Sequence, residues 1–253
     1  MEIHEILDRL EIINPADQFF TDLRKTILNN DKYALFRLIQ SITDSQLIEG
    51  LRKYKDDTKF NSDCFSRGQL QSKLWLIEEL QNLNIDLGTV FLCAGWYGTL
   101  ATMLFESNIP VDKIRSFDID DSCIDIAKTF NRPWVIDEWR FQASTEDIHN
   151  INFTEHTYTV TRADGTSAEL LDRPDTIINT SCEHIKNFKE WYNKIPKGKL
   201  VVLQSNNYYS IEDHVNCSED LEEFSNSVPM SLILYEGELE LNKYTRFMKI
   251  GLR

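Results

Sequence analysis

A short apolar run that breaks into a glycine-containing turn constrains the fold of this chain more than any other feature. Residues 89–94 read as a buried strand, Gly95 and Gly98 mark the turn, and a helical stretch follows. The next apolar run ends at Asp118, 118 − 95 = 23 positions after Gly95. That is close to the spacing of about 20 between a ligand-binding turn and an acid that binds ribose hydroxyls. The pattern predicts a nucleoside-cofactor site, with backbone N–H groups at the helix start free to hold a polar ligand.

The residues inside the turn restrict which cofactor fits. The turn reads Gly95-Trp96-Tyr97-Gly98 and lacks the GxGxxG pattern that lets a backbone approach a pyrophosphate. The bulky Trp96 and Tyr97 occupy that space, so a dinucleotide is disfavoured. The alternative is an ordinary strand-to-helix turn followed by a solvated helix cap, because two further aspartates come directly after Asp118.

The chain from residue 86 onward predicts an α/β fold. Short apolar runs alternate with helical stretches, which is typical of a mostly parallel sheet with crossover helices. Strands are expected near 89–94, 114–119, 138–143, 175–180 and 199–205, and helices starting near Tyr97, Asp121, Glu183 and Ser218. Residues 230–251 predict a C-terminal antiparallel hairpin, which brings the sheet to seven strands. Asp164-Gly165, between β-rich flanks, predicts a β-hairpin insertion over about 155–172.

Residues 1–85 predict a helical N-terminal region. Apolar residues recur at steps of three and four, as at Ile3, Ile6 and Leu10 and again at Leu35, Leu38 and Ile42. We therefore divide the chain into a helical region, 1–85, and a Rossmann-like cofactor-binding domain, 86–253. No flexible linker separates them, so the helical region is expected to pack on the sheet domain and to have a lid, substrate-selecting or packing role.

Composition narrows the class of protein. Of the 253 residues 42% are hydrophobic, enough for a sizeable core, yet no apolar stretch approaches the roughly 20 residues that span a bilayer. The first residues lack a signal-peptide core, so no membrane association and a cytoplasmic location are expected. The five cysteines show no CxxC pair, which argues against a disulfide framework or a zinc knuckle. A net charge of −14 makes nucleic acid an unlikely partner without excluding it.

Two polar segments are expected at the carboxyl edge of the sheet, where open α/β folds bind ligands. The first runs from Asn179 to His184, where Glu183 or His184 could take a proton. The alternative is that Glu183 caps a helix and His184 supports the scaffold. Cys182, beside them, is expected to be a packing residue.

The second polar segment follows the strand near 199–205. It carries amides, tyrosines and His214, and it predicts either an aromatic-walled substrate pocket or a solvated loop. Its side chains Glu212, His214 and Cys217, together with His184, lack a recognisable ligand spacing, so no metal site is expected.

On these residues the chain resembles the class I S-adenosylmethionine-dependent methyltransferases over residues 88–253. In that family the first strand ends in a looser glycine turn, the second strand ends in an acid, and an antiparallel hairpin closes the sheet. The resemblance implies that the turn Gly95–Gly98 flanks the methionine moiety, with Asp118 on the ribose hydroxyls. An acid that receives the adenine amino group commonly follows the third strand; Ser144 stands there, so Ser144, Thr145 or Asp147 could contact the base.

The resemblance also implies roles for other residues. Asn179 is expected beside the cofactor, and Gln69 or Lys73 could reach its carboxylate unless they form a solvated first helical turn. Glu183, His184 and His214 are expected to assist an acceptor nitrogen or oxygen that attacks the methyl group in line.

The leading hypothesis is therefore a methyltransferase that uses S-adenosylmethionine and acts on a small-molecule or peptide acceptor. The aromatic Trp96-Tyr97 turn suggests a second hypothesis, transfer of the aminocarboxypropyl group of the same cofactor. The missing glycine and Ser144 suggest a third, a non-catalytic binding subunit with this fold. The acceptor and the oligomeric state cannot be read from these residues.

Overall fold

The computed structural model describes residues 46–54, 57, 60–161 and 165–253. The chain divides into two compact units, Met1–Asp56 and Asp57–Arg253. The described part of the first unit is helix α4 (Gln46–Tyr54). The helical periodicity predicted around Ile3 and Leu35 lies outside the described residues.

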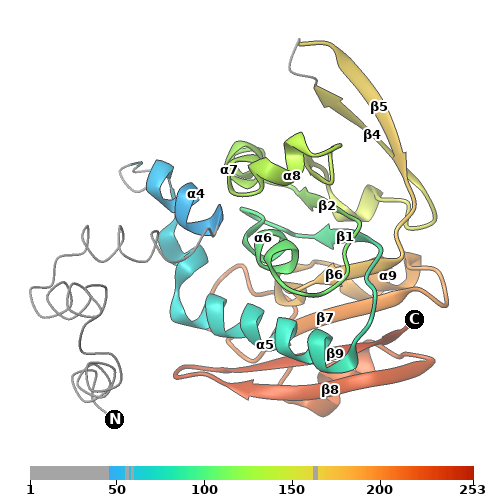
Figure 1. Cartoon of the computed structure of the whole chain (residues 1–253). Helices are drawn as coiled ribbons and strands as arrows, with labels where there is room; N and C mark the ends of the chain where they lie inside the picture. Colours follow the sequence, from blue (N-terminus) through green and yellow to red (C-terminus); the bar gives the residue numbers. More distant parts are fainter. Residues whose placement is uncertain (1–45, 55–56, 58–59, 162–164) are drawn as a thin grey trace, which may run out of the picture. The chain divides into compact units, whose positions relative to one another are not determined.

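The second unit is built on a seven-stranded sheet with the strand order β3-β2-β1-β6-β7-β9-β8 (Figure 1). The first five of these strands run parallel, whereas β9 pairs antiparallel with both β7 and β8. The predicted mostly parallel sheet with a C-terminal antiparallel hairpin is thereby confirmed. The strands are β1 (Thr89–Cys93), β2 (Lys113–Asp118), β3 (Phe141–Thr145), β6 (Thr176–Asn179), β7 (Leu200–Asn206), β8 (Leu232–Glu240) and β9 (Thr245–Leu252).

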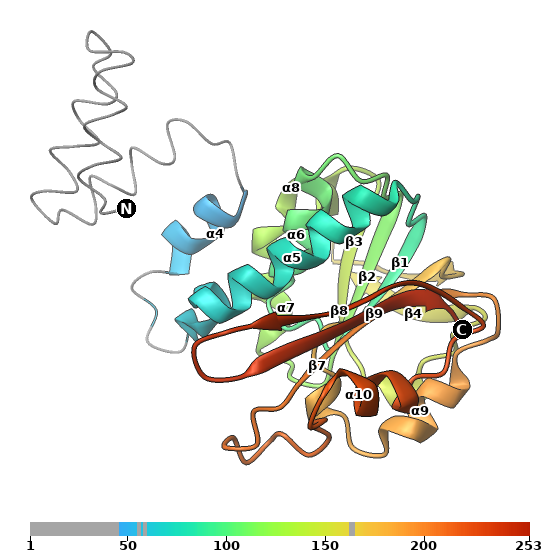
Figure 2. The same ribbon diagram turned by 90° about the horizontal axis from the view of Figure 1, so that it is seen from below.

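Helices cover both faces of this sheet because its central strands are apolar on both sides. Val90 and Leu92 of β1 belong to one core, while Phe91 and Cys93 belong to the core on the opposite face, as the alternation of a strand requires. Figure 2 shows the helices of the first face beside the strands and those of the second face below them. The first face carries α5 (Arg67–Leu83), α6 (Thr99–Glu106) and α7 (Cys123–Phe130), and the second carries α9 (Phe188–Lys194) and α10 (Leu221–Ser227).

Helix α5 belongs to the sheet unit. Ser66 caps its start by accepting the N–H of Gln69 at 3.4 Å, and Asn84 ends it in a left-handed conformation with φ 50°. Its Leu76 and Leu80 are fully buried in the core of the first face. The compact unit therefore extends upstream of residue 86, the boundary predicted from the change in apolar pattern, because α5 buries its apolar side against the sheet.

Helix α10 begins at Leu221, three residues after the predicted Ser218, and two further starts differ for a reason in the backbone. Strand β3 begins at Phe141 and not near 138, because Glu138 and Trp139 adopt positive φ values of 47° and 55° after the short helix α8 (Arg132–Ile136). A helix was predicted near Glu183, but only the 3-10 turn η3 (Cys182–His184) forms there. The helix α9 starts five residues later, after Asn187 with φ 51°.

The predicted β-hairpin insertion is present as β4 (His156–Thr161) and β5 (Ser167–Asp172), which pair with each other and not with the main sheet. Figure 1 shows the pair extending away from the seven strands. Its base is fixed to β2, because the buried Arg115 donates from Nε to Asp172 at 2.6 Å. Asp164 of the predicted turn lies outside the described residues.

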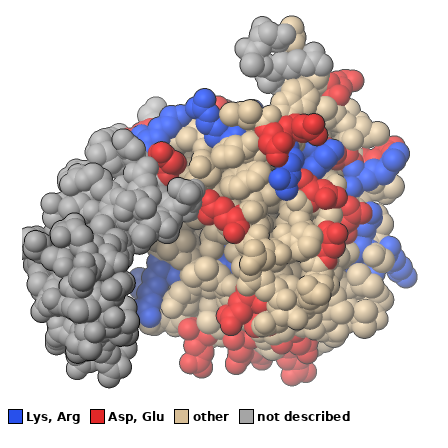
Figure 3. Space-filling view, in the orientation of Figure 1, with Lys and Arg blue, Asp and Glu red and all other residues tan. Residues whose placement is uncertain are grey.

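Acidic side chains are spread over the surface seen in Figure 3 and gather along its lower edge, the side of β8 in Figure 1. On this edge strand Glu236, Glu238 and Glu240 are exposed, and such charges discourage pairing with another strand. In the described part of the chain, none of the helices is long and apolar enough to cross a membrane.

Candidate functional site: the carboxyl edge of the sheet

The turn after β1 is tightly wound against β2. Ala94, Trp96 and Gly98 have positive φ values of 54°, 48° and 64°. A Cβ atom on Gly95 would come within 2.1 Å of the Ser116 side-chain oxygen on β2, so this position has no room for a side chain. Two non-glycine residues in the left-handed region cost of order 1–3 kcal/mol each, and such strain concentrates at functional sites.

Asp118 ties the end of β2 to this turn. Its Oδ2 accepts the backbone N–H of Trp96 at 2.7 Å, and its Oδ1 accepts that of Asp120 at 3.1 Å. A carboxylate has about four acceptor positions, so Asp118 retains capacity for two more donors. The acid that was expected on the ribose hydroxyls thus also holds the turn itself, through a direct hydrogen bond.

The backbone N–H groups of the turn differ from the expectation that they are free. Gly95 donates to the carbonyl of Phe117 at 3.1 Å and Gly98 donates to that of Gly95 at 2.9 Å, in addition to the bond from Trp96 to Asp118. These three groups are used to hold the turn itself. A ligand at this turn would therefore have to bind side chains such as Asp118, or backbone N–H groups at the start of α6 other than these three.

The two aromatic residues of the turn are stacked. The rings of Trp96 and Tyr97 lie 4.9 Å apart, and Phe60 stacks on Tyr97 at 5.3 Å. Tyr97 is buried, and its hydroxyl accepts the N–H of Asn61, which precedes the 3-10 turn η1 (Ser62–Phe65), at 3.3 Å. Tyr97 therefore joins the segment before α5 to the turn, whereas Trp96 is only half-buried.

The residues considered for the adenine ring lie at the end of β3, beside Asp118 in the strand register. Ser144 is half-buried and Thr145 is exposed. Asp147 caps the short turn η2 (Ile148–Asn150) by accepting the N–H of His149 at 2.8 Å. Ser144 and Thr145 thus lie next to the end of β2, and Asp147 follows them along the chain.

Asn179 ends β6 opposite Cys93 of β1 in the strand register. It is fully buried, and its Oδ1 accepts the N–H of Ser181 at 2.9 Å. Its Nδ2 has no partner within the described residues. A buried donor without a partner costs of order 1–3 kcal/mol, so an atom in this position is suited to bind a ligand.

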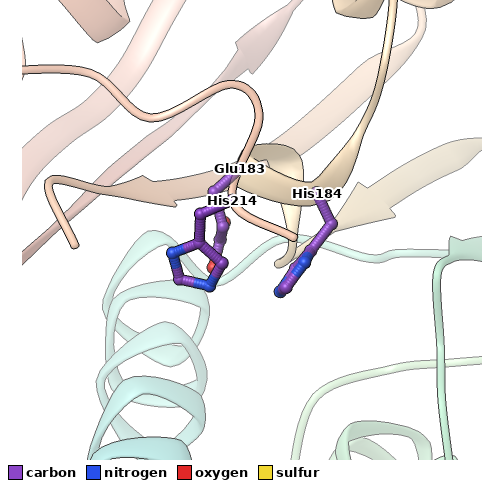
Figure 4. A group of neighbouring side chains, drawn as sticks. All are labelled: Glu183, His184 and His214. Atoms are coloured by element: carbon purple, nitrogen blue, oxygen red, sulfur yellow. The ribbon is translucent and has the colours of Figure 1, made fainter. Parts of the chain in front are cut away.

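Glu183, His184 and His214 come together although they leave different segments (Figure 4). The carbonyl of Glu183 accepts the N–H groups of Val215 and Asn216, each at 2.9 Å. These bonds fix the loop after β7 on the turn η3 after β6. As a result the rings of His184 and His214 lie 4.5 Å apart, edge to face.

Glu183 is buried in a set of polar side chains. Its Oε1 accepts from Asn206 at 2.6 Å and from Arg246 at 3.1 Å. Its Oε2 is buried and has no partner among the described residues. Arg246 was not recognised from the sequence; the available signal was a charged residue inside a segment that otherwise reads as a buried strand.

Lys73 and Cys182, which the sequence also singled out, are both buried inside the protein. Lys73 is buried and donates from Nζ to Gln69 at 2.5 Å, and burial, with Arg246 nearby, lowers the pKa of Lys73 to about 7. Cys182 is fully buried, and burial raises the pKa of its thiol, which agrees with a packing role. All five cysteines of the chain are free thiols, and four of them are buried.

The histidines differ in exposure. His184 is exposed, and its Nδ1 lies 3.2 Å from the carbonyl of Asp213. His214 is half-buried with its Nδ1 2.6 Å from the carbonyl of Tyr208, and burial lowers the pKa of His214. The loop that carries His214 is thus ordered by backbone bonds, and Tyr208 stacks on Tyr244 at 5.2 Å.

Comparison with known proteins gives similarity at the level of structure. No protein-family model matches the chain, and no curated protein matches it by sequence. The N-methyltransferase NodS from Bradyrhizobium japonicum WM9, solved with S-adenosyl-L-homocysteine, is similar with a TM-score of 0.55 at 9% identity, covering 83% of this chain and 98% of that one.

Two further solved structures are similar. The magnesium protoporphyrin IX methyltransferase ChlM from Synechocystis PCC 6803, solved with bound S-adenosylmethionine, has a TM-score of 0.50 at 13% identity, covering 86% of this chain and 96% of that one. The [4+2]-cyclase SpnF has a TM-score of 0.54 at 8% identity, covering 83% and 94%. The chain has the Rossmann-like fold of the class I S-adenosylmethionine-dependent methyltransferases.

Proposed function

We propose that this protein is a methyltransferase that uses S-adenosylmethionine. The observation that carries the proposal is the bond between Asp118 and the backbone of Trp96, which makes the acid and the turn one rigid unit at the carboxyl edge of β1 and β2. The fold and the cofactors named for NodS and ChlM support the same conclusion.

The residues present fit the cofactor. The unused acceptor positions of Asp118 suit the two ribose hydroxyls, and the orphaned Nδ2 of Asn179 offers a donor beside the turn of residues 94–98. Ser144, Thr145 or Asp147 would contact the adenine. S-adenosylmethionine supplies a methyl group already activated by its sulfonium, so the protein has chiefly to position the acceptor and exclude water.

Glu183, His184 and His214 are the side chains we assign to the acceptor. They lie at the same sheet edge as Asn179, and the unprotonated nitrogen of a histidine can take or hold a proton from an acceptor nitrogen or oxygen. A small molecule or a peptide is the favoured acceptor, because a chain with a net charge of −14 repels phosphate backbones.

Titration calorimetry with S-adenosylmethionine tests the cofactor site. Asp118→Asn keeps one oxygen, which can accept the N–H of Trp96, but it loses the acceptor for the N–H of Asp120 and removes the charge that would hold the ribose. We expect its affinity to fall about tenfold or more, since a hydrogen bond to a charged group contributes roughly 1.5–3 kcal/mol. Asp125→Asn, at an exposed position on α7, is the matched control and should bind like the unchanged protein. Absence of binding at millimolar cofactor would refute the proposal.

Product analysis separates methyl transfer from its alternatives. S-adenosylhomocysteine as product identifies methyl transfer, and methylthioadenosine identifies aminocarboxypropyl transfer. The fold does not by itself fix the reaction, since SpnF, which has a similar structure, is named as a [4+2]-cyclase. Binding without turnover over a panel of amine, hydroxyl and peptide acceptors would favour a binding subunit.

A further inference from the structure

Three potential metal ligands converge at the carboxyl edge of β6. Each of Glu183, His184 and His214 offers one ligand atom, and these atoms all lie within 4.8 Å of one another. Figure 4 shows the three side chains extending to the same side of the segments that carry them. The spacing in the sequence gave no reason to expect this, because His184 and His214 are 214 − 184 = 30 positions apart.

The backbone fixes which nitrogen of each histidine is available. The Nδ1 atoms face the carbonyl oxygens of Asp213 and Tyr208, at 3.2 Å and 2.6 Å. A carbonyl oxygen only accepts, so each Nδ1 must carry the proton and each neutral ring leaves its Nε2 as a lone pair. Histidines that bind metals are commonly held in this way, by donating their other N–H to a backbone carbonyl.

The carboxylate provides an independent observation. Glu183 is 2% exposed, and its Oε2 has no partner among the described residues. Asn206 and Arg246 both donate to the other oxygen, Oε1. The carboxylate is therefore anchored through one oxygen while the second is left without a donor, although an ionised buried oxygen needs one.

We propose that Glu183, His184 and His214 bind a divalent transition-metal ion, with Zn²⁺ as the best match to two imidazoles and one carboxylate. Two histidines and a glutamate are a known ligand set of zinc sites that keep an open position, and such sites have metal–ligand distances of about 2.0–2.2 Å. Ligand atoms within 4.8 Å must approach by about 1 Å to meet these distances. His184 is exposed and can make that adjustment.

The open position would let the cation bind the acceptor of the methyl group. This part of the inference rests on the proposed function. Three protein ligands leave at least one site for an oxygen of the acceptor. With the metal bound, the Nε2 atoms of both histidines are used as ligands, and the cation replaces them in activating the acceptor: it lowers the pKa of a bound hydroxyl and positions it. The site thus favours an acceptor with an oxygen ligand over a simple amine.

Zinc binding by the full-length, chelator-treated protein tests the site directly, without cofactor. We expect close to one high-affinity Zn²⁺ per chain by calorimetry, and a Co²⁺-substituted protein with the visible absorption of a bound ion. His184→Ala and His214→Ala should each weaken binding by about 100-fold or more, since loss of a supporting partner alone commonly costs 10–100-fold. His149→Gln changes a histidine outside the cluster, whose Nε2 lies 2.9 Å from the carbonyl of Lys186, and should leave binding unchanged.

The outcomes distinguish this inference from the proposed function. Absence of zinc binding, or equal binding by the unchanged protein and both histidine variants, would overturn the metal site. If His214→Ala does not fold, the exposed His184→Ala carries the test alone, with circular dichroism as the check. Cofactor binding is measured separately on the metal-free protein, so a failed metal test leaves the cofactor result intact, and the reverse also holds.

Discussion

At the scale of single residues, the turn after β1 depends on the absence of a side chain at Gly95. Its missing side chain lets the backbone approach Ser116, and the turn then presents the Trp96 amide to Asp118. Its close neighbours Ala94 and Trp96 have positive φ values although they are not glycines. The geometry of the turn is therefore set by contact with β2 and not by the preferences of its own residues.

Gly95→Ala should destabilise the protein by about 1–3 kcal/mol, because the new Cβ atom would overpack the space at Ser116. Urea unfolding measures this loss. Ser116→Ala removes the clashing oxygen, so the double variant should recover a large part of the loss. Gly95 itself does not have a positive φ, so the loss measures the contact with Ser116, and Ser116→Ala alone is the control for the change at residue 116. A Gly95→Ala protein as stable as the unchanged one would show that the turn is not packed as described.

At the scale of elements, the hairpin β4–β5 depends on one buried polar group at its base. Asp172 accepts from the hydroxyl of Tyr158 and from Nε of Arg115. Burial by itself raises the pKa of Asp172, but these two bonds, together with the positive charges of Arg115 and Lys113, outweigh it and hold the pKa below the ordinary value of 3.8. The stability that Asp172 contributes is therefore present above pH 3.8 and is lost as the pH falls through the lower, folded-state pKa.

Asp172→Ala should cost about 3–5 kcal/mol in the free energy of unfolding, because it leaves Arg115, whose side chain is 3% exposed, without its counter-charge. Hydrogen exchange over residues 156–172 should show whether the hairpin loosens first. Glu169→Gln on the same strand is exposed and should change stability by no more than about 0.5 kcal/mol. A loss that is equally small for Asp172→Ala would contradict this role.

At the scale of the whole molecule, the free energy of unfolding should depend on pH through Lys73, a buried lysine of α5. Burial, with Arg246 nearby, lowers the pKa of Lys73 from 10.5 to about 7. Between these two values the unfolded chain binds more protons than the folded one, so the free energy of unfolding rises with pH. Below the folded-state pKa the burial of the charged amine opposes folding in full.

The expected slope for Lys73 is up to about 1.4 kcal/mol per pH unit. It should be measured by urea unfolding from about pH 7 to about pH 8.5. At higher pH a second effect opposes it, since burial raises the pKa of thiols such as Cys64 and ionisation then favours the unfolded chain. Lys73→Met should remove the slope and raise stability at pH 7, whereas Lys189→Met, at an exposed position, should do neither. An unchanged slope in Lys73→Met would contradict the assignment.

The architecture of the sheet unit could be predicted from the sequence because it depends on neighbours along the chain. The apolar runs, the turn after residue 94 and the two hairpins are local patterns, and the strand order confirms the α/β fold they indicate. Starts of β3 and α9 were misplaced because left-handed residues such as Trp139 and Asn187 carry no glycine signal. The hydrogen bond from the Trp96 N–H to Asp118 was not predicted, because the sequence pattern indicated only a ribose-binding role for Asp118.

The sequence alone determined the periodicities, and with them the layers and the sheet edge at which polar residues collect. Only the tertiary structure decided which of those residues meet. Arg246 reaches Glu183 across 63 positions, and His214 reaches His184 through a loop held by backbone bonds to η3. The physical reason is that a periodicity follows from the geometry of one segment, whereas a contact between distant side chains depends on how every intervening turn and loop closes.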